Sequence, residues 1–261
     1  VNINRTTMQS RARANNSGTT NWNMYTYRAH RILTVLYLVE YHVPTLESFN
    51  AELTAEGYHQ GGLGDGVTTG NIKVNGVDTW SFIPCGSTDE HGNSTGITSV
   101  TVNSTDAEGV ATQKSYNVPT YRGIENPFGH VWKNCIDTLV HFNAQTNKND
   151  VYINTDLSTF GSTNISDYDY QCSTTITEGY KKKLVYNAAF DILPPIDEAF
   201  GGSTTTYWCD YNWTNNSTTD RLTLIGGHAS AGTYAGLLTV SSSLGLGVAG
   251  AAVGTRLIYI P

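Results

Sequence analysis

The C-terminal stretch between Arg221 and Arg256 contains no Asp, Glu, Lys or Arg, so His228 is its only side chain that could carry a positive charge. Glycine stands at eight positions of this stretch: 226, 227, 232, 236, 245, 247, 250 and 254. Such a stretch fits three structures: a membrane anchor, a glycine-rich core segment, or a surface of uncharged side chains that binds a partner. The rest of the chain has to decide between them.

A membrane anchor is the poorest fit of the three. Residues 235–255 span the roughly 20 positions that a membrane-crossing helix needs. Their serines, threonines and glycines make insertion unfavourable, and residues 255–260 have the composition of a strand. We therefore expect no membrane insertion, and a membrane-anchored surface protein is kept as an alternative.

The charge balance argues against a nucleic-acid partner. The formal net charge is -7, and 14% of the residues are charged, whereas about 25% is usual. Phosphate binding needs clustered Lys and Arg, and the one basic run, Lys181 to Lys183, fits a solvated strand edge that discourages edge pairing. The surface is expected to consist largely of Asn, Thr, Ser, Gly and Tyr.

Two helices are predicted near the N-terminus. In residues 22–41, apolar side chains recur at the spacing of an amphipathic helix: Tyr25, Ala29, Ile32, Leu33, Leu36 and Tyr37. Asn21 is its expected N-cap, and Pro44 ends any continuation. A second helix is predicted over 45–57, with Thr45 as its cap and Gly57 at its end.

After Gly61 the sequence changes to short runs rich in β-branched and aromatic residues. Asn75-Gly76 lies between two such runs and predicts a hairpin. Further strands are predicted around 98–102, 180–189, 206–211, 221–225 and 255–260. The predicted class is α+β, with two N-terminal helices followed by short strands and long loops. Residues 1–20 are expected to be a polar lead-in outside the core, and residues 21–261 one ligand-binding domain.

No motif predicts catalysis, a metal or a cofactor. The glycines of 61–70 lack the flanking strand, helix and Lys of a phosphate loop, and His228 stands where a nucleophile elbow around Ser230 needs glycine. Cys85 with His91 and Cys135 with His141 do not form the two matched halves of a zinc site. The four cysteines allow three disulfide pairings if the protein is exported, and buried free thiols are the favoured interpretation.

Four segments, in order, resemble the formylglycine-generating-enzyme-like domains. They are VPTLESFNAEL at 43–53, NPFGHVWKN at 126–134, IGGH at 225–228 and VGTRL at 253–257. The resemblance implies a variant of the C-type lectin fold. The enzymes of that family need cysteines shortly after the Gly-Gly pair, and GGHASAGTYAGLL has none, so formylglycine generation is not expected.

One branch of this fold, the phage tail and retroelement-diversified variable proteins, is similar also in RGIENPFG at 122–129. In that branch the last region faces the ligand. The resemblance therefore implies ligand-binding residues in the C-terminal stretch: His228, Ser230, Ala231, Tyr234, Ser241, Ser243, Leu244 and Val248. Trp213 is added as the nearby aromatic residue expected to be exposed.

These observations predict a non-enzymatic receptor-binding or adhesin protein in a virion tail or on an extracellular surface. Its expected partners are a bacterial surface glycan or protein and other virion or surface proteins, and the resemblance to tail proteins implies a homotrimer. A structural virion component without a receptor of its own is the alternative with the same fold.

Overall fold

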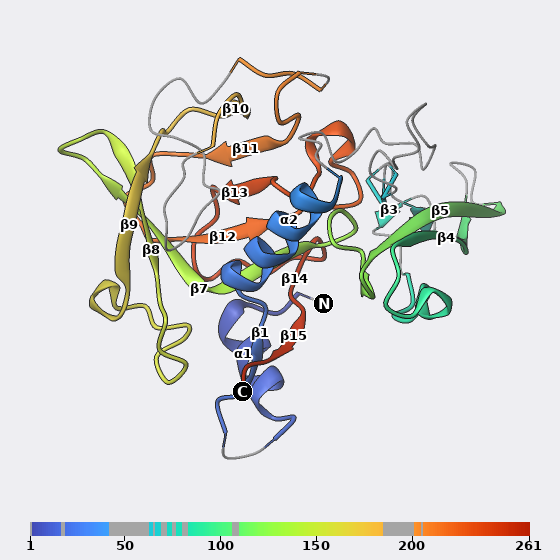
Figure 1. Cartoon of the computed structure of the whole chain (residues 1–261), viewed down its shortest axis with the longest axis horizontal. Helices are drawn as coiled ribbons and strands as arrows, with labels where there is room; N and C mark the ends of the chain where they lie inside the picture. Colours follow the sequence, from blue (N-terminus) through green and yellow to red (C-terminus); the bar gives the residue numbers. More distant parts are fainter. Residues whose placement is uncertain are drawn as a thin grey trace.

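The fold is built around a curled eight-stranded sheet, as a computed structural model of the chain shows (Figure 1). A five-stranded sheet lies to one side, and a two-stranded ribbon lies near the termini. The structure describes residues 2–16, 19–41, 63–64, 66–68, 72–74, 77–79, 83–105, 110–184, 201–204 and 206–261. Its mixed helix and sheet content confirms the predicted α+β class.

The large sheet is mixed, because β11 runs parallel to β13 while most other neighbours are antiparallel. A further short strand, β14 (Val253–Gly254), lies parallel to β7. The spatial order is β10 (Gly179–Tyr180), β11 (Tyr211–Thr214), β13 (Val240–Ser242), β12 (Arg221–Ile225), β7 (Trp132–Asn143), β8 (Lys148–Ile153) and β9 (Asp169–Thr174).

The second sheet contains the predicted hairpin. Strand β2 (Ile72–Val74) pairs antiparallel with β3 (Val77–Thr79), with Val74 opposite Val77, and the predicted turn residues 75–76 lie outside the described residues. The sheet continues through β4 (Gly96–Thr105), β5 (Ala111–Tyr121) and β6 (Ile124–Glu125). Strands β4, β5 and β7 have 10, 11 and 12 residues, so the expectation of short strands is wrong for these three.

The helix predicted over 22–41 begins five residues later than expected, because Trp22–Met24 forms strand β1 and pairs with β15 (Leu257–Tyr259). Asn21 is not the N-cap, since its side chain donates to the Ile260 carbonyl at 2.7 Å. Helix α2 (Tyr27–Tyr41) therefore starts where the ribbon ends.

Two side chains cap helix α2. The hydroxyl of Thr26 accepts the N–H of Ala29 at 3.1 Å. The carboxylate of Asp137, from the middle of β7, accepts the N–H of Tyr27 at 2.7 Å and of Arg28 at 3.3 Å. The second cap comes from 110 residues further along the chain, so the sequence around the helix could not predict it.

The buried face of α2 also differs from the predicted one. Tyr27, His30, Leu33, Thr34 and Tyr37 are buried at three- and four-residue spacing. Ile32 and Leu36, expected in the core, are 62% and 43% exposed. The apolar spacing predicted the wrong face because two polar residues, His30 and Thr34, point inward and make their hydrogen bonds inside the protein.

The expectation that residues 1–20 lie outside the core is corrected by helix α1 (Arg5–Arg13). Asn4 caps it by accepting the N–H of Thr7 at 3.0 Å. Met8 and Ala12 pack into a core cluster with the side chains of the large sheet. The buried Arg5 guanidinium donates to the Ile136 carbonyl of β7 at 2.5 Å, which fixes the helix on the sheet.

The strand predictions had mixed outcomes. The predictions around 98–102, 221–225 and 255–260 are confirmed by β4, β12 and β15. The prediction around 206–211 is wrong up to Asp210, because Tyr207 and Cys209 have φ angles of 61° and 55°, which no strand contains. Of 180–189, the structure places Tyr180 in β10, and residues from 185 lie outside the described part. The helix predicted over 45–57 also lies outside the described residues.

The capping role of Asp137 gives a stability prediction. We expect Asp137→Ala to lower the free energy of unfolding by about 2 kcal/mol, because one buried and one part-buried N–H group lose their acceptor. Chemical denaturation measures the change. Asp169→Ala, at an exposed position of β9, is the matched control and should leave stability within about 0.5 kcal/mol. Equal stability of the two variants would contradict the capping role.

Candidate binding site

A continuous group of aromatic side chains, here called the aromatic face, lies at one end of the large sheet. It consists of Tyr180, Tyr211, Trp213 and Tyr234, with Trp132 and His228 at its inner end. Neighbouring ring centroids are between 4.6 Å and 5.8 Å apart. These are the separations of ring pairs in direct contact.

Strand pairing positions most of these rings. Tyr180 of β10 lies directly opposite Tyr211 of β11, and their rings meet edge to face with centroids 5.1 Å apart. Tyr211 and Trp213 are two residues apart in one strand, so they share a face of the sheet. Trp132, at the start of β7, continues the group with its ring edge to face against Trp213 at 5.4 Å.

Tyr234 covers the group from a 3-10 turn, Gly232–Tyr234, in the uncharged C-terminal stretch. Its ring stacks on Tyr180 at an interplanar angle of 26°, and it is 43% exposed. The Thr239 hydroxyl donates to the Tyr234 carbonyl at 2.6 Å. The Tyr180 hydroxyl lies 3.3 Å from the hydroxyl of Thr233, which gives the group a polar edge.

Two buried titratable side chains, Lys181 and Asp210, hold the backbone that follows this turn. Asp210 accepts the N–H of Leu238 at 3.2 Å and the hydroxyl of Thr239 at 3.1 Å, and Lys181 donates to the Leu238 carbonyl. Burial raises the pKa of Asp210 and lowers that of Lys181. The expectation that the basic run is a solvated edge is therefore wrong at Lys181, which is 1% exposed, and right at Lys183, which is exposed.

A glycine turn brings His228 to the group. Gly226 and Gly227 have φ angles of 89° and 80°, and a Cβ atom on Gly227 would stand 2.5 Å from the Cβ atom of Ala235. The His228 ring packs edge to face on Trp132 with centroids 5.8 Å apart. Ser230, which is exposed, contacts the His228 Nδ1 atom through its N–H and its hydroxyl, both at 3.1 Å. Burial lowers the pKa of His228.

The structure brings together four of the nine predicted ligand-binding residues: Trp213, His228, Ser230 and Tyr234. Contrary to expectation, Ala231 and Ser241 are 6% and 5% exposed, because they pack under α2 and inside strand β13. The remaining three lie after β13: Ser243 is half-buried, Leu244 is 37% exposed, and Val248 packs against a core cluster.

Three members of the aromatic face were not predicted: Tyr180, Tyr211 and Trp132. Only Tyr211 had a sequence signal: it stands two residues before Trp213, and side chains two apart in a strand lie on the same face of the sheet. Tyr180 and Trp132 come from distant strands, and only the sheet order brings them near. Within the described residues, no three His, Cys, Asp or Glu side chains are grouped closely enough to hold a metal ion.

The cysteines carry no disulfide. Cys135 and Cys209 are buried, Cys172 is half-buried and Cys85 is exposed, so the expectation of buried free thiols holds for two of the four. The helices that the structure describes are all too short or too polar to cross a membrane. Residues 235–255 contain β13 and β14 in place of the helix that a membrane anchor would require.

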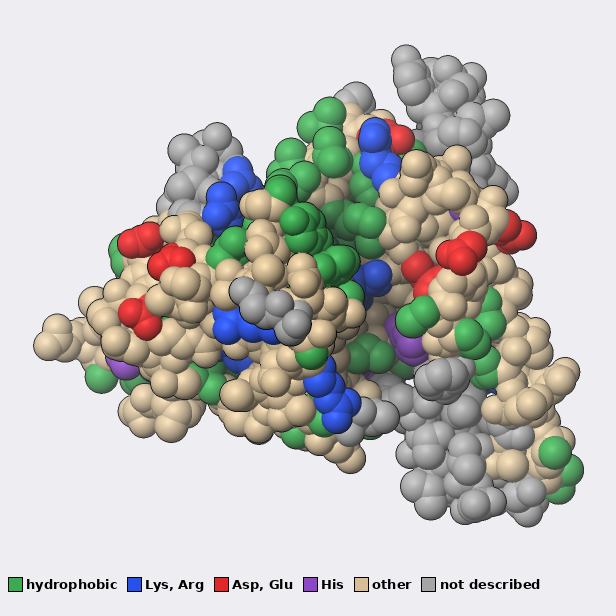
Figure 2. Space-filling model, turned by 90° about the horizontal axis from the view of Figure 1, so that it is seen from below, with side chains coloured by type: hydrophobic (Ala, Val, Ile, Leu, Met, Phe, Trp, Pro, Cys, Tyr) green, Lys and Arg blue, Asp and Glu red, His purple; other side chains and the backbone are tan. Residues whose placement is uncertain are grey.

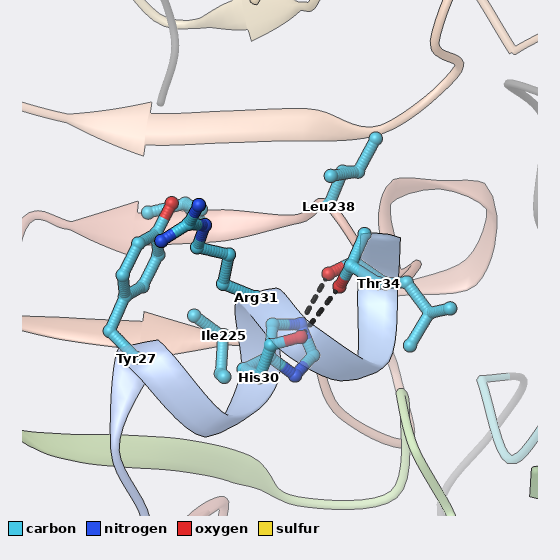
Figure 3. A pocket seen from close by; sticks show the side chains of 8 residues that line it. Tyr27, His30, Arg31, Thr34, Ile225 and Leu238 are labelled. Atoms are coloured by element: carbon cyan, nitrogen blue, oxygen red, sulfur yellow. Dashed lines mark hydrogen bonds between the residues drawn. The ribbon is translucent and has the colours of Figure 1, made fainter. Parts of the chain in front are cut away.

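Away from the aromatic face, the buried side chain of His30 faces a cavity of about 10 Å³ between α2 and the large sheet. Its Nε2 atom contacts the Leu237 carbonyl at 2.5 Å, and the Thr34 hydroxyl donates to the His30 carbonyl at 2.9 Å (Figure 3). The space holds about one water molecule. Because burial lowers the pKa of His30 to about 3, the ring is neutral and donates its Nε2 proton. This cavity is therefore part of the packing and too small for a ligand.

A scan of family models and a search of the curated proteins each found no match for this chain.

The low pKa of His30 predicts a pH-dependent stability. A histidine whose pKa falls on folding stabilises the protein above its ordinary pKa of 6.5, and that stability is lost as the pH falls toward 3. We expect the stability difference between the native protein and His30→Gln to shrink by up to about 1.4 kcal/mol per pH unit below 6.5. Glutamine can still donate to the Leu237 carbonyl but does not titrate. The other titratable groups contribute equally to both proteins, so their effect drops out of the stability difference. Denaturation curves at several pH values test this, and parallel pH profiles would contradict it.

Proposed function

We propose that the chain is a non-enzymatic receptor-binding or adhesin protein that binds a bacterial surface glycan through the aromatic face. The observation that carries the proposal is the continuous group of rings, of which Tyr234 is 43% exposed and Tyr180, Tyr211 and Trp213 are half-buried. Aromatic rings offer flat apolar surfaces with little conformational entropy to lose. The hydroxyl groups of Ser230 and Thr233 beside them offer donors and acceptors without charge.

We further propose that the fold is a C-type-lectin-like fold of the formylglycine-generating-enzyme type. Three of the four resembling segments meet in space, which supports this proposal. The Gly129 N–H donates to the Gly226 carbonyl at 2.7 Å, Val253 lies opposite Trp132 in parallel strands, and Arg256 donates to the carbonyls of residues 125 and 126. The fourth segment, 43–53, lies outside the described residues.

The proposed location is a phage tail or another displayed surface, and the proposed assembly is a homotrimer joined to other virion or surface proteins. In this arrangement the uncharged C-terminal stretch has two roles. Its inner part packs as β13 and core, while the turn with His228, Ser230 and Tyr234 contributes to the binding surface.

Cell binding tests the proposed function. Labelled protein is incubated with a panel of intact gut bacteria that includes a genuine host, and bound protein is measured by flow cytometry. We expect strain-selective binding that Tyr234→Ala and Trp213→Ala each weaken at least about tenfold, because truncation of a central aromatic residue costs about 2 kcal/mol or more. The matched control is Tyr170→Ala, at a 55% exposed position of β9 at the other edge of the sheet.

Thermal unfolding of each variant separates a lost contact from a lost fold. Equal weakening by Tyr170→Ala, or unchanged binding by both aromatic-face variants, would contradict the proposal. Absence of binding to every strain would favour a structural virion component without its own receptor.

A further inference from the structure

A second cavity, of about 250 Å³, opens where the large sheet meets the five-stranded sheet. Seen from below, the surface is hollowed between the body of the large sheet and the part that carries β4 and β5, and charged and histidine side chains meet there (Figure 2). The lining comes from the end of β6, the turn before β7 and the residues between β14 and β15. Two of the resembling segments, 126–134 and 253–257, form most of it.

Two basic side chains, Lys133 and Arg256, line this cavity. Lys133 is 5% exposed, and among the described residues its ammonium makes one hydrogen bond, a long one from Nζ to the Gly129 carbonyl at 3.4 Å. Arg256 uses its Nη2 atom on two backbone carbonyls, of Glu125 and Asn126. Across the part of the chain that the structure describes, neither cation makes an ion pair within 4.0 Å.

The pKa shifts agree with this geometry. Burial lowers the pKa of Lys133, and the neighbouring Arg256 lowers it further. Burial likewise lowers the pKa of Arg256. The Glu125 carboxylate opposes the shift at Arg256. An anion bound beside Lys133 and Arg256 favours the charged form of Lys133.

The other polar groups of the cavity restrict what that anion can be. Glu125 also lines the cavity, but its carboxylate is held by the N–H and hydroxyl of Thr88 at 3.0 and 3.3 Å. With Lys133 protonated, Lys133, Arg256 and the one acid leave a net charge of about one, which suits a single carboxylate better than a doubly charged phosphate. The Oδ1 atom of Asn126, which is buried without a hydrogen-bond partner, can accept a ligand hydroxyl. Cys85 and His130 complete the polar lining.

We propose that this cavity binds the carboxylate of an acidic sugar between Lys133 and Arg256, with a sugar hydroxyl donating to Asn126. The volume is below the roughly 300 Å³ at which sites for drug-sized ligands begin, so it takes one terminal residue of a glycan. Trp132 lines the cavity and also contacts Trp213 and His228 of the aromatic face. The inference rests on the proposed function, because it names the acidic residue of the glycan that the aromatic face would bind.

Binding of glucuronate and of glucose to the intact chain tests the assignment. The two sugars differ only at C6, which is a carboxylate in glucuronate and a hydroxymethyl group in glucose. Isothermal titration calorimetry should detect glucuronate and not glucose. Lys133→Met, which removes the charge and keeps the chain length, should weaken glucuronate binding at least about tenfold. Glu125→Gln, which removes the competing acid, should strengthen it severalfold. Lys183→Met, at an exposed position, is the charge-matched control and should have no effect.

Opposite effects of Lys133→Met and Glu125→Gln cannot come from a general loss of folding, so together they support the site. Equal affinity for glucose, or for inorganic phosphate, would overturn the assignment of a carboxylate sugar. The same conclusion follows if glucuronate does not bind. If cell binding then still depends on Tyr234, the proposed function stands and this inference alone fails. If glucuronate binds but Tyr234→Ala leaves cell binding unchanged, the proposed function fails instead.

Discussion

The contact between the Asp137 carboxylate and the first N–H groups of α2 is the constraint on which much of the structure depends. Strand β7, which carries Asp137, pairs with β12, β8 and β14, so it is the strand that the rest of the large sheet shares. Burial raises the pKa of Asp137 to about 6, while the N–H groups of Tyr27 and Arg28 oppose that rise. The carboxylate is therefore mostly ionised at neutral pH and favoured by the helix N-terminus. It fixes the direction of α2, and with it the face that packs on the sheet.

Other buried polar groups act in the same way elsewhere in the fold. Arg5 holds α1 on β7, and the Lys181 and Asp210 pair holds the backbone beside the turn of Tyr234. Arg221, which is fully buried, donates to Asn215, Asn149 and Ser242 and thereby joins three separate segments. Burial lowers its pKa to about 10, so it keeps its charge at neutral pH. The chain has few charged residues, and several of them are buried. Removing the hydrogen-bond partner of such a buried charge would lower the stability of the fold.

Trp132 connects the two candidate binding regions. It stands at the first position of β7, next to Lys133, and its ring contacts both Trp213 and His228. Trp132 also lines the cavity that Lys133 lines, so this one ring belongs to both regions. This placement makes the segment 126–134, and not only the C-terminal stretch, part of the proposed recognition surface.

The sequence by itself determined what depends on neighbouring residues: a helix within 22–41, though not its first residue, the pairing of the two runs around 75–76, the strand at 221–225 and the α+β class. These follow from side-chain periodicity and turn preference, which act over a few residues. Only the tertiary structure decided which polar residues lie inside, because a buried charge needs a partner that sequence distance hides: Asp137 stands 110 residues from Tyr27. The aromatic face was decided in the same way, since its rings come from β7, β10, β11 and the loops after β12. Strand order, set by packing and not by local sequence, is what brings them together.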